Sequence, residues 1–455
     1  MNSWELIPTE ENLILTLKED ILKRNEKLVC FYELLLAQEN GGAIALDGHW
    51  GSGKTFFVKQ SMLIINSKNP LSKIEERKKQ EILKNISFNE KDDENCDLAI
   101  YYDAWENDND MDPILSIVYE ITKQLGLSYP LKDQGKVFET AASIMELLSG
   151  RNIEGIIRSL KSDNPLSKME EQKEIQTKLR NFFTDLLPER GNRLVIFIDE
   201  LDRCKPSYAV KLLEEVKHYL SDERILIVFS VNLRELQHTI KHFYGDSFDA
   251  CRYLDRFFNL RITIPPANLN GYYQKIGLTS DDTTPLICKK VIENYNFELR
   301  EISKYYQQVK VAIHKYLNGD GRWDSSFPDG KGKEWILAVI VPIMIGLKII
   351  DIPLYDDFIN GKTLQPLIDI LATRDFGEYL LPPLLNSDEA YTEEAGKKLV
   401  TQEEKLKKLY DAIFVKDYSS ASYRENIGRY AFDGTSKEFA IKAASMLSSF
   451  ADYQS

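Results

Sequence analysis

The sequence lacks an excess of positive charge. Its 58 Lys and Arg residues are outnumbered by 71 Asp and Glu residues, which gives a formal net charge of −13 over 455 residues. Broad, sequence-independent binding to nucleic acid needs a basic surface, so this balance argues against it. The chain contains no nuclease motif either, and the sequence gives no direct evidence for binding to nucleic acid, although a local basic face could still exist.

Cysteine is sparse and irregularly placed. The five cysteines are Cys30, Cys96, Cys204, Cys251 and Cys288. They form no C-x-x-C pair, and their spacing predicts no disulfide framework. The N-terminal segment carries Glu5, Glu10 and Glu11 and lacks the basic and apolar regions of a signal peptide. Together these observations predict a cytoplasmic chain.

Long apolar segments are scarce as well. The run from Ile336 to Leu347 spans 12 residues, short of the ~20 that a helix needs to cross a bilayer. Pro342 lies in its middle, and Lys348 and Asp351 prevent an extension. We therefore expect a buried core helix, kinked or broken at Pro342, and no membrane span.

What the sequence does contain is a glycine-rich loop of the form G-x-x-x-x-G-K-T. It lies between an apolar segment at 43–46 and an apolar, helix-like segment at 56–65. A strand, a loop and a helix in this order form a phosphate cradle, because the glycines let backbone N–H groups turn inward and the helix start adds its own donors. The alternative is a glycine turn without a ligand. The predicted nucleotide-binding residues are Gly48, His49, Trp50, Gly51, Ser52, Gly53, Lys54 and Thr55.

Four side chains have specific expected roles. Lys54 reaches the β and γ phosphates, and the Thr55 hydroxyl binds Mg²⁺. A second apolar strand, at 194–198, ends in Asp199 and Glu200. Asp199 suits a ligand of Mg²⁺, direct or through water, and Glu200 can orient and deprotonate an attacking water. The alternative is an acidic helix cap after an ordinary core strand.

Other polar residues at strand and helix ends have two interpretations each. Asn232 follows an apolar strand and is either a sensor of the γ-phosphate or the N-cap of the next helix. Arg203 either contacts phosphate or forms an ion pair with Asp202 or another carboxylate near the site. Arg256 acts as an arginine finger, in cis or in a neighbouring subunit, or is a surface arginine. Arg252 and Arg300 are alternatives for the finger.

The apolar pattern divides the chain into four parts. Residues 1–40 form a helical lead-in, and the predicted strands fall within a core made of 41–106 and 193–270. Between the two core segments, 107–192 has the pattern of a helical insertion. Residues 271–455 follow as a helical C-terminal domain. We expect an α/β fold with a parallel sheet and an all-helical C-terminal region.

Six segments together resemble the KAP family of P-loop NTPases, over roughly residues 15–315. They read GHWGSGKT, YYDAWEND, VIFIDELDRCKP, VFSVNLREL, YLDRFFNLRITIPP and ELREISKYYQQV. Trp50-Gly51 within the loop and the Asp-Ala-Trp run at 103–105 are specific to that group. The resemblance implies a sheet of order 5-1-4-3-2 with helices on both faces. It also implies phosphate and Mg²⁺ roles for Lys54 and Thr55.

The same resemblance assigns the metal role to Asp199 and the water role to Glu200. Two departures from the family pattern are visible. Many members carry transmembrane helices between the second and third strands, whereas 107–192 is charged throughout, so the chain looks like a soluble, bacterial-type member. Asn232 stands where an acidic residue is common, which leaves its sensor role open.

The implied activity is Mg²⁺-dependent ATP hydrolysis coupled to a conformational change or to assembly, with a protein partner or self-association. Anti-phage defence is the implied biological role. One alternative is a nucleotide-dependent switch or scaffold with little turnover, and a second is a P-loop kinase. The sequence has no guanine-reading N-K-x-D run, which favours ATP over GTP.

Overall fold

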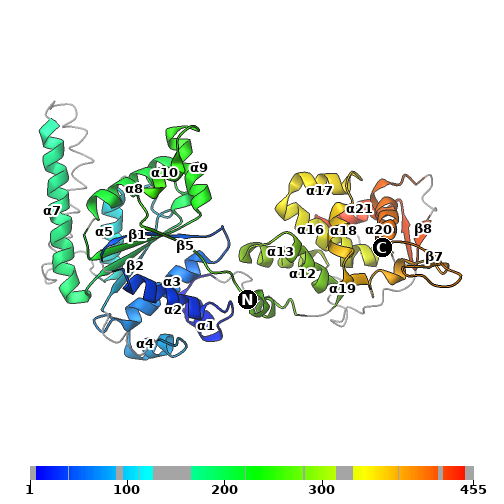
Figure 1. The fold of residues 1–455 in the computed structure, drawn as a ribbon, viewed down its shortest axis with the longest axis horizontal. Helices are drawn as coiled ribbons and strands as arrows, with labels where there is room; N and C mark the ends of the chain where they lie inside the picture. Colours follow the sequence, from blue (N-terminus) through cyan, green and yellow to red (C-terminus); the bar gives the residue numbers. More distant parts are fainter. Residues whose placement is uncertain are drawn as a thin grey trace. The chain divides into compact units, whose positions relative to one another are not determined.

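The computed structural model describes residues 7–445, apart from 39, 89–95, 111, 127–164, 221, 280–281, 314–331, 378 and 419–423. The chain divides into two compact units, with the boundary between Gly271 and Tyr272 (Figure 1). Each unit has its own buried core, and the two are described in turn.

The N-terminal unit is built on a five-stranded parallel sheet of order β2-β3-β4-β1-β5. This is the order implied by the family resemblance, and it is confirmed. The inner strands are almost continuous apolar runs, as expected where both faces of a parallel sheet are covered. The strands are β1 (Gly42–Asp47), β2 (Leu98–Asp103), β3 (Leu194–Asp199), β4 (Ile225–Val231) and β5 (Leu260–Thr263).

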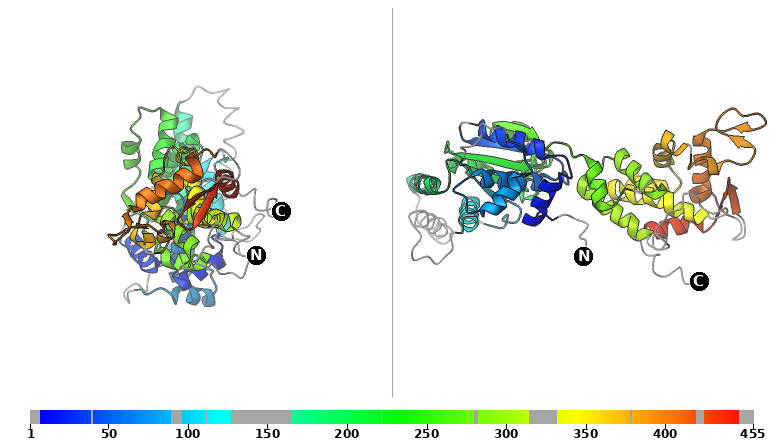
Figure 2. Two further views of the ribbon diagram at one scale, coloured as in Figure 1. Left: turned by 90° about the vertical axis from the view of Figure 1, so that its right-hand side faces the viewer. Right: turned by 90° about the horizontal axis from the view of Figure 1, so that it is seen from below.

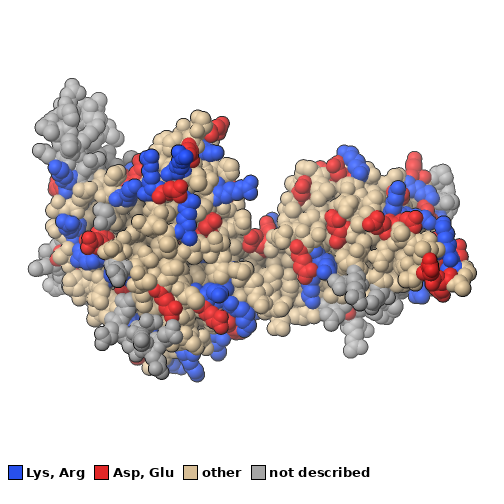
Figure 3. All heavy atoms as spheres, viewed as in Figure 1, with Lys and Arg blue, Asp and Glu red and all other residues tan. Residues whose placement is uncertain are grey.

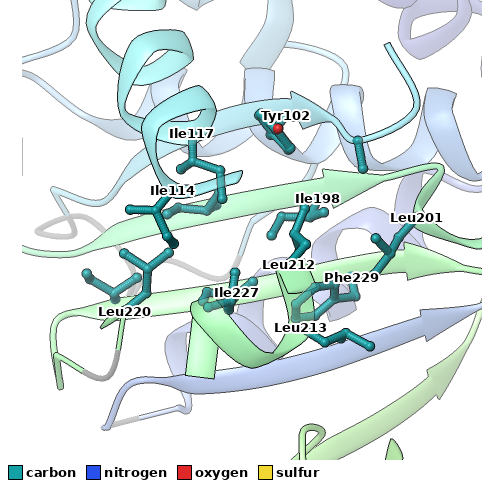
Figure 4. Close-up of a cluster of buried hydrophobic side chains, with 14 of the residues drawn as sticks. Tyr102, Ile114, Ile117, Ile198, Leu201, Leu212, Leu213, Leu220, Ile227 and Phe229 are labelled. Carbon is teal, nitrogen blue, oxygen red and sulfur yellow. The ribbon is translucent and has the colours of Figure 1, made fainter. Parts of the chain in front are cut away.

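Helices cover both faces of this sheet (Figures 1 and 2). Side chains alternate along each strand, so Ile44 and Leu46 enter one core while Ala45 enters the other. The first core is closed by α1 (Glu10–Glu19), α2 (Asn25–Leu36), α3 (Lys54–Lys68) and α4 (Glu76–Leu83). The second is closed by α5 (Pro113–Gln124), α7 (Pro165–Arg190), α8 (Pro206–Tyr219), α9 (Leu233–Tyr244) and α10 (Ala250–Asp255). Figure 4 shows side chains of this second core filling the space between strands and helices.

Helices account for most of the described part of the predicted insertion. Helix α5 follows β2 and α7 precedes β3, while residues 127–164 lie outside the described residues. Leu179, Phe182 and Phe183 of α7 are buried in the second core. The C-terminal end of α7 is thus part of the second core and not an appendage to it.

The unit that begins at Tyr272 is mainly helical. The expected helical C-terminal region is confirmed, with two small two-stranded sheets added. Its α-helices are α11 (Leu269–Ile276, which starts before the boundary), α12 (Thr283–Asn294), α13 (Leu299–Ala312), α15 (Gly332–Trp335), α16 (Val341–Ile350), α17 (Ile352–Ile359), α18 (Gln365–Leu371), α19 (Arg374–Gly377), α20 (Gln402–Tyr410) and α21 (Ser436–Ala444). The sheets pair β6 (Glu389–Ala390) with β7 (Lys398–Leu399), in parallel, and β8 (Arg424–Ile427) with β9 (Tyr430–Asp433), antiparallel.

The apolar run at 336–347 is the buried centre of this unit, as expected. Every residue from Ile336 to Leu347 is buried. A π-helical turn, Ile336–Ile340, precedes Pro342, which lies in the first turn of α16. The π-helical turn changes the hydrogen-bond register of the helix, and this change accommodates a proline that has no N–H to donate. Tyr305 donates a hydrogen bond to the Pro342 carbonyl over 3.1 Å.

No helix in the described ranges is long and apolar enough to cross a membrane. The described surface carries both signs of charge. On the face shown in Figure 3, Lys and Arg side chains lie among Asp and Glu side chains on both units. A mixed surface of this kind fits the overall acidic balance of the chain.

Candidate functional site: a phosphate loop facing an acidic strand end

The loop between β1 and α3 depends on glycine at three positions. Gly51 and Gly53 have φ angles of 89° and 88°, in the left-handed region that side chains disfavour. At Gly48, a Cβ atom would lie 2.5 Å from Ile264 Cγ2 and 2.9 Å from Ser52 Oγ. The backbone therefore takes a shape that the predicted glycines alone allow.

Lys54 begins α3, and its side chain folds back over the loop. Its Nζ donates to the carbonyls of Gly48, over 2.6 Å, and His49, over 3.1 Å. The residue is 8% exposed. Burial lowers the pKa of Lys54, and the carboxylates of Asp202 and Asp199 offset part of that effect. The ammonium group is held at the centre of the loop, where it would meet phosphate oxygens.

Thr55 connects the loop to the acidic strand. Its Oγ1 donates to Asp199 Oδ2 over 2.7 Å, and Tyr101 of β2 donates to the same oxygen over 3.1 Å. Asp199, at the end of β3, is fully buried, and its Oδ1 accepts from the backbone N–H of Glu200. The structure thus brings together the hydroxyl and the carboxylate that the sequence assigns to the metal.

Glu200 follows β3 in a backbone conformation that is rare for its residue type. Its φ of 61° places it in the left-handed region, a strain often found at functional sites. Its Oε2 forms an ion pair with Arg203 Nε at 2.5 Å. Burial and the neighbouring Asp199 carboxylate raise the pKa of Glu200 to about 7, against the lowering effect of Arg203.

A pair of tryptophans lies beside this ion pair. Trp50, from the loop, donates from Nε1 to Asp202 Oδ2 over 2.5 Å. The Arg203 guanidinium lies 5.8 Å from the ring centre of Trp50 and 5.6 Å from that of Trp105. Of the two interpretations of Arg203, the ion pair is the one observed. Its partner is Glu200 rather than Asp202.

Asn232 caps a helix, as one of its two interpretations predicted. Its side-chain oxygen accepts from the backbone N–H groups of Arg234, at 3.2 Å, and Glu235, at 3.4 Å, at the start of α9. Asn232 follows β4, at the same end of the sheet as Asp199. Its role as a phosphate sensor stays a prediction.

Arg256 does not lie at the phosphate loop of its own chain. Arg256 lines a cavity of about 300 Å³ with Gly42, the first residue of β1, whereas the phosphate loop follows the last residue of β1. The cis role for Arg256 is therefore wrong. Helix α10 precedes β5, a strand parallel to β1, so its end lies at the amino ends of the strands. The role in a neighbouring subunit stays a prediction.

The alternative finger candidates have other surroundings. Arg252 is highly exposed and pairs with Asp249 at 3.4 Å. Arg300 belongs to the C-terminal unit, in α13. Neither placement adds support for a role at the phosphate loop.

Two residues near the loop were missed from the sequence. Tyr101 could have been found, because alternation places its side chain on the same face as Phe197 and Asp199 of the adjacent strand. Arg24, just before α2, is buried and donates to the Ser52 carbonyl over 2.9 Å. Nothing in the local pattern marks Arg24, because its role depends on how the lead-in folds against the loop.

We expect a Tyr101→Phe variant to need more Mg²⁺ for nucleotide binding. Loss of the phenol removes one donor that orients Asp199, and such outer partners of metal ligands affect metal affinity by about tenfold or more. The measurement is the Mg²⁺ concentration at half-maximal binding of a fluorescent ATP analogue. Tyr119→Phe, on the exposed side of α5, is the control. An unchanged Mg²⁺ requirement would contradict the orienting role.

The donor set at Thr55 and Asp199 fits Mg²⁺. A hydroxyl and a carboxylate oxygen, already 2.7 Å apart, are the hard ligands that Mg²⁺ prefers, with phosphate oxygens and water completing its shell. In the described part of the chain, no group of three His, Cys, Asp or Glu side chains is arranged to hold a metal. A Mg²⁺ ion at this site would therefore rely on nucleotide as well as on protein.

This sheet order, with a phosphate loop after β1 and a buried carboxylate at the end of β3, defines a P-loop NTPase. The model of the KAP family P-loop domain matches residues 25–283, which is more than half of the chain. The chain belongs to the KAP family of P-loop NTPases. No curated protein matches it significantly.

Proposed function

We propose that this protein hydrolyses ATP with Mg²⁺ and couples the turnover to a conformational change or to assembly with a partner. The observation that carries the proposal is the contact between Thr55 of the loop and Asp199 of the acidic strand. It supports the proposal because the hydroxyl and the carboxylate that we expect to bind Mg²⁺ lie in contact with each other, with Lys54 before Thr55 and Glu200 after Asp199 in the chain. Nucleotide binding alone would need the loop, whereas hydrolysis also needs the carboxylates.

Each residue has one task in the proposed reaction. Lys54 binds the β and γ phosphates, and Thr55 and Asp199 hold Mg²⁺, which would neutralise charge on the phosphates. Glu200 orients a water in line with the γ-phosphorus and accepts its proton as the new P–O bond forms. The bond from the γ-phosphorus to the bridging oxygen breaks, and ADP leaves with that oxygen.

Two alternatives remain as competing proposals. A switch or scaffold would bind ATP through the same loop with negligible turnover, and ATP-dependent oligomerisation measured by light scattering would favour it. A kinase would transfer the phosphoryl group to an acceptor. The adjacent Asp199 and Glu200 favour water as the acceptor, because they supply both metal binding and a base for water. Cytoplasmic location and anti-phage defence stay predictions from the sequence.

The test is release of inorganic phosphate by purified protein from Mg-ATP, with GTP as the competing substrate. Lys54→Ala, prepared in the same way, sets the background from contaminating ATPases. We expect phosphate release well above that background, arrest by EDTA, preference for ATP and no phosphorylated acceptor among the products. Equal release by the wild type and Lys54→Ala would refute hydrolysis at this site.

A further inference from the structure

A cation is enclosed by two indoles at the edge of the site. Arg203 lies within 6 Å of the ring centres of both Trp50 and Trp105, the range of favourable cation–π contacts. Its side chain is only 21% exposed, although Trp50 and Trp105 are 45% and 53% exposed. Two large exposed aromatics thus shield one arginine from water.

Each indole comes from a different part of the site. Trp50 belongs to the phosphate loop and is anchored by its hydrogen bond to Asp202. Trp105 follows β2, where the backbone N–H of Ala104 donates to the Asp199 carbonyl over 3.0 Å. The guanidinium is therefore contacted by one indole from the loop and by another that follows the neighbouring strand.

The enclosed arginine has one ionic partner in the described structure, and that partner is Glu200. Glu200 also has the strained backbone that is common at functional sites, and the ion pair with Arg203 is the contact that orients its carboxylate. A planar guanidinium suits this task because its donors are fixed in direction, unlike those of a lysine ammonium.

We propose that Arg203 is a positioning residue. Its guanidinium, which makes cation–π contacts with Trp50 and Trp105, fixes the Glu200 carboxylate in the orientation that the proposed base needs for hydrolysis. The inference rests on the proposed function of the site. It gives the exposed Trp105 a role in turnover without contact to nucleotide. It also gives loop residue Trp50 a second task, since the same side chain that belongs to the phosphate cradle helps to hold the base.

The kinetic test uses Trp105, because its exposure lets variants fold normally and because it lies outside the phosphate loop. We expect Trp105→Ala to lower kcat for ATP about five- to tenfold, the equivalent of one lost cation–π contact, with KM within twofold of the wild type. Trp105→Phe keeps an aromatic face and should restore most of kcat. Arg203→Lys should be impaired as strongly as Trp105→Ala.

The matched control is Tyr119→Ala. Tyr119 is 54% exposed and has Lys123 Nζ at 5.9 Å from its ring centre, so it is an exposed aromatic with a cation that lies on α5 and not at the site. It should leave kcat and KM unchanged. Wild-type kcat in both Trp105→Ala and Arg203→Lys, or a raised kcat in either, would overturn the proposal. A raised KM at constant kcat would overturn it too, since it would mean that the indole binds nucleotide.

A second measurement does not depend on hydrolysis. The difference in acrylamide quenching between the wild type and Trp105→Phe reports the accessibility of Trp105, and the same difference is taken in an Arg203→Ala background. We expect the Trp105 signal to be quenched more steeply without Arg203. Equal quenching would overturn the enclosed cation even if the wild type hydrolyses ATP. If the Trp105 signal is quenched more steeply without Arg203 but the wild type shows no turnover, the proposed function is refuted and the contact of Arg203 with Trp105 is supported.

Discussion

A Glu200→Gln variant should bind Mg-ATP as tightly as the wild type and hydrolyse it about a hundred times more slowly or worse, the loss expected for a missing general base. Glutamine fills the same space and accepts a hydrogen bond, but it cannot take the proton of the attacking water. The measurement pairs phosphate release with binding of a fluorescent ATP analogue. Full activity in Glu200→Gln would remove Glu200 from the mechanism.

Lys54→Ala should fail at the earlier step. Its ammonium is the cation held at the centre of the loop, so its loss should weaken ATP binding by about tenfold or more, as expected for a charge-assisted contact. Lys68→Ala, in the last turn of the same helix, is the matched control and should bind normally. If Lys54→Ala lost turnover but bound ATP as tightly as the wild type, Lys54 would act in the chemical step alone.

A comparison of Glu200→Gln with Lys54→Ala can also identify a binding partner. A protein that binds ATP without hydrolysing it is held in its ATP-bound arrangement, because differential contacts in the two nucleotide states drive any coupled change. Glu200→Gln isolated from its native host should therefore retain a partner, or self-associate, where Lys54→Ala does not.

The second large effect concerns stability of the C-terminal unit. Lys405 and Glu389 form a hydrogen-bonded ion pair in which the two side chains are 1% and 5% exposed. Replacing Lys405 with methionine leaves a buried carboxylate without its main partner, and removal of one member of a buried pair costs about 3–5 kcal/mol. We therefore expect that unit to unfold at a lower urea concentration in the variant than in the wild type. The emission of the fully buried Trp335 follows the unfolding.

The chain offers its own control for this prediction. Lys408 also contacts Glu389, at 3.7 Å, but its side chain is 53% exposed, so Lys408→Ala should cost about 1 kcal/mol or less. Glu389→Gln combined with Lys405→Met should recover most of the loss, since no charge is then left unpaired. A double variant as unstable as Lys405→Met would point to lost packing as the cause.

The same pair predicts a dependence on pH. Burial alone would raise the pKa of Glu389, but the hydrogen bonds from Lys405 and from the Asn386 backbone bring it below its ordinary value. A lowered folded-state pKa means that the stabilisation is present at neutral pH and is lost as the pH falls through that value. The difference between wild type and Lys405→Met should therefore shrink below about pH 4.

The nucleotide core was predictable because its signals are local. The pattern Gly48–Thr55 defines both the glycines that turn the backbone and the lysine that follows them. Asp199 was predictable because a carboxylate at the end of a buried strand, downstream of such a loop, is well suited to hold the metal of a bound nucleotide. The sheet order came from the family resemblance, since apolar strands alone do not say which neighbours they pair with.

The contacts that surround the core were not predictable in the same way. The partner of Arg203 depends on the left-handed turn at Glu200, which points that carboxylate towards residue 203. The buried pair in the C-terminal unit joins residues 16 positions apart through a fold that no local pattern specifies. The short strands β8 and β9 were missed because helical spacing dominates the residues around them.

The left-handed backbone at Glu200 lowers the stability of the fold at the residue that we propose as the base. A residue with a Cβ atom in this region costs about 1 kcal/mol or more relative to glycine, so the chain would fold more easily with glycine at this position. Under the proposed mechanism, substitutions there that stabilise the protein would also abolish hydrolysis. Selection for thermostability alone would then favour a protein that binds nucleotide without the proposed turnover, and a screen that measures stability alone would not detect the change.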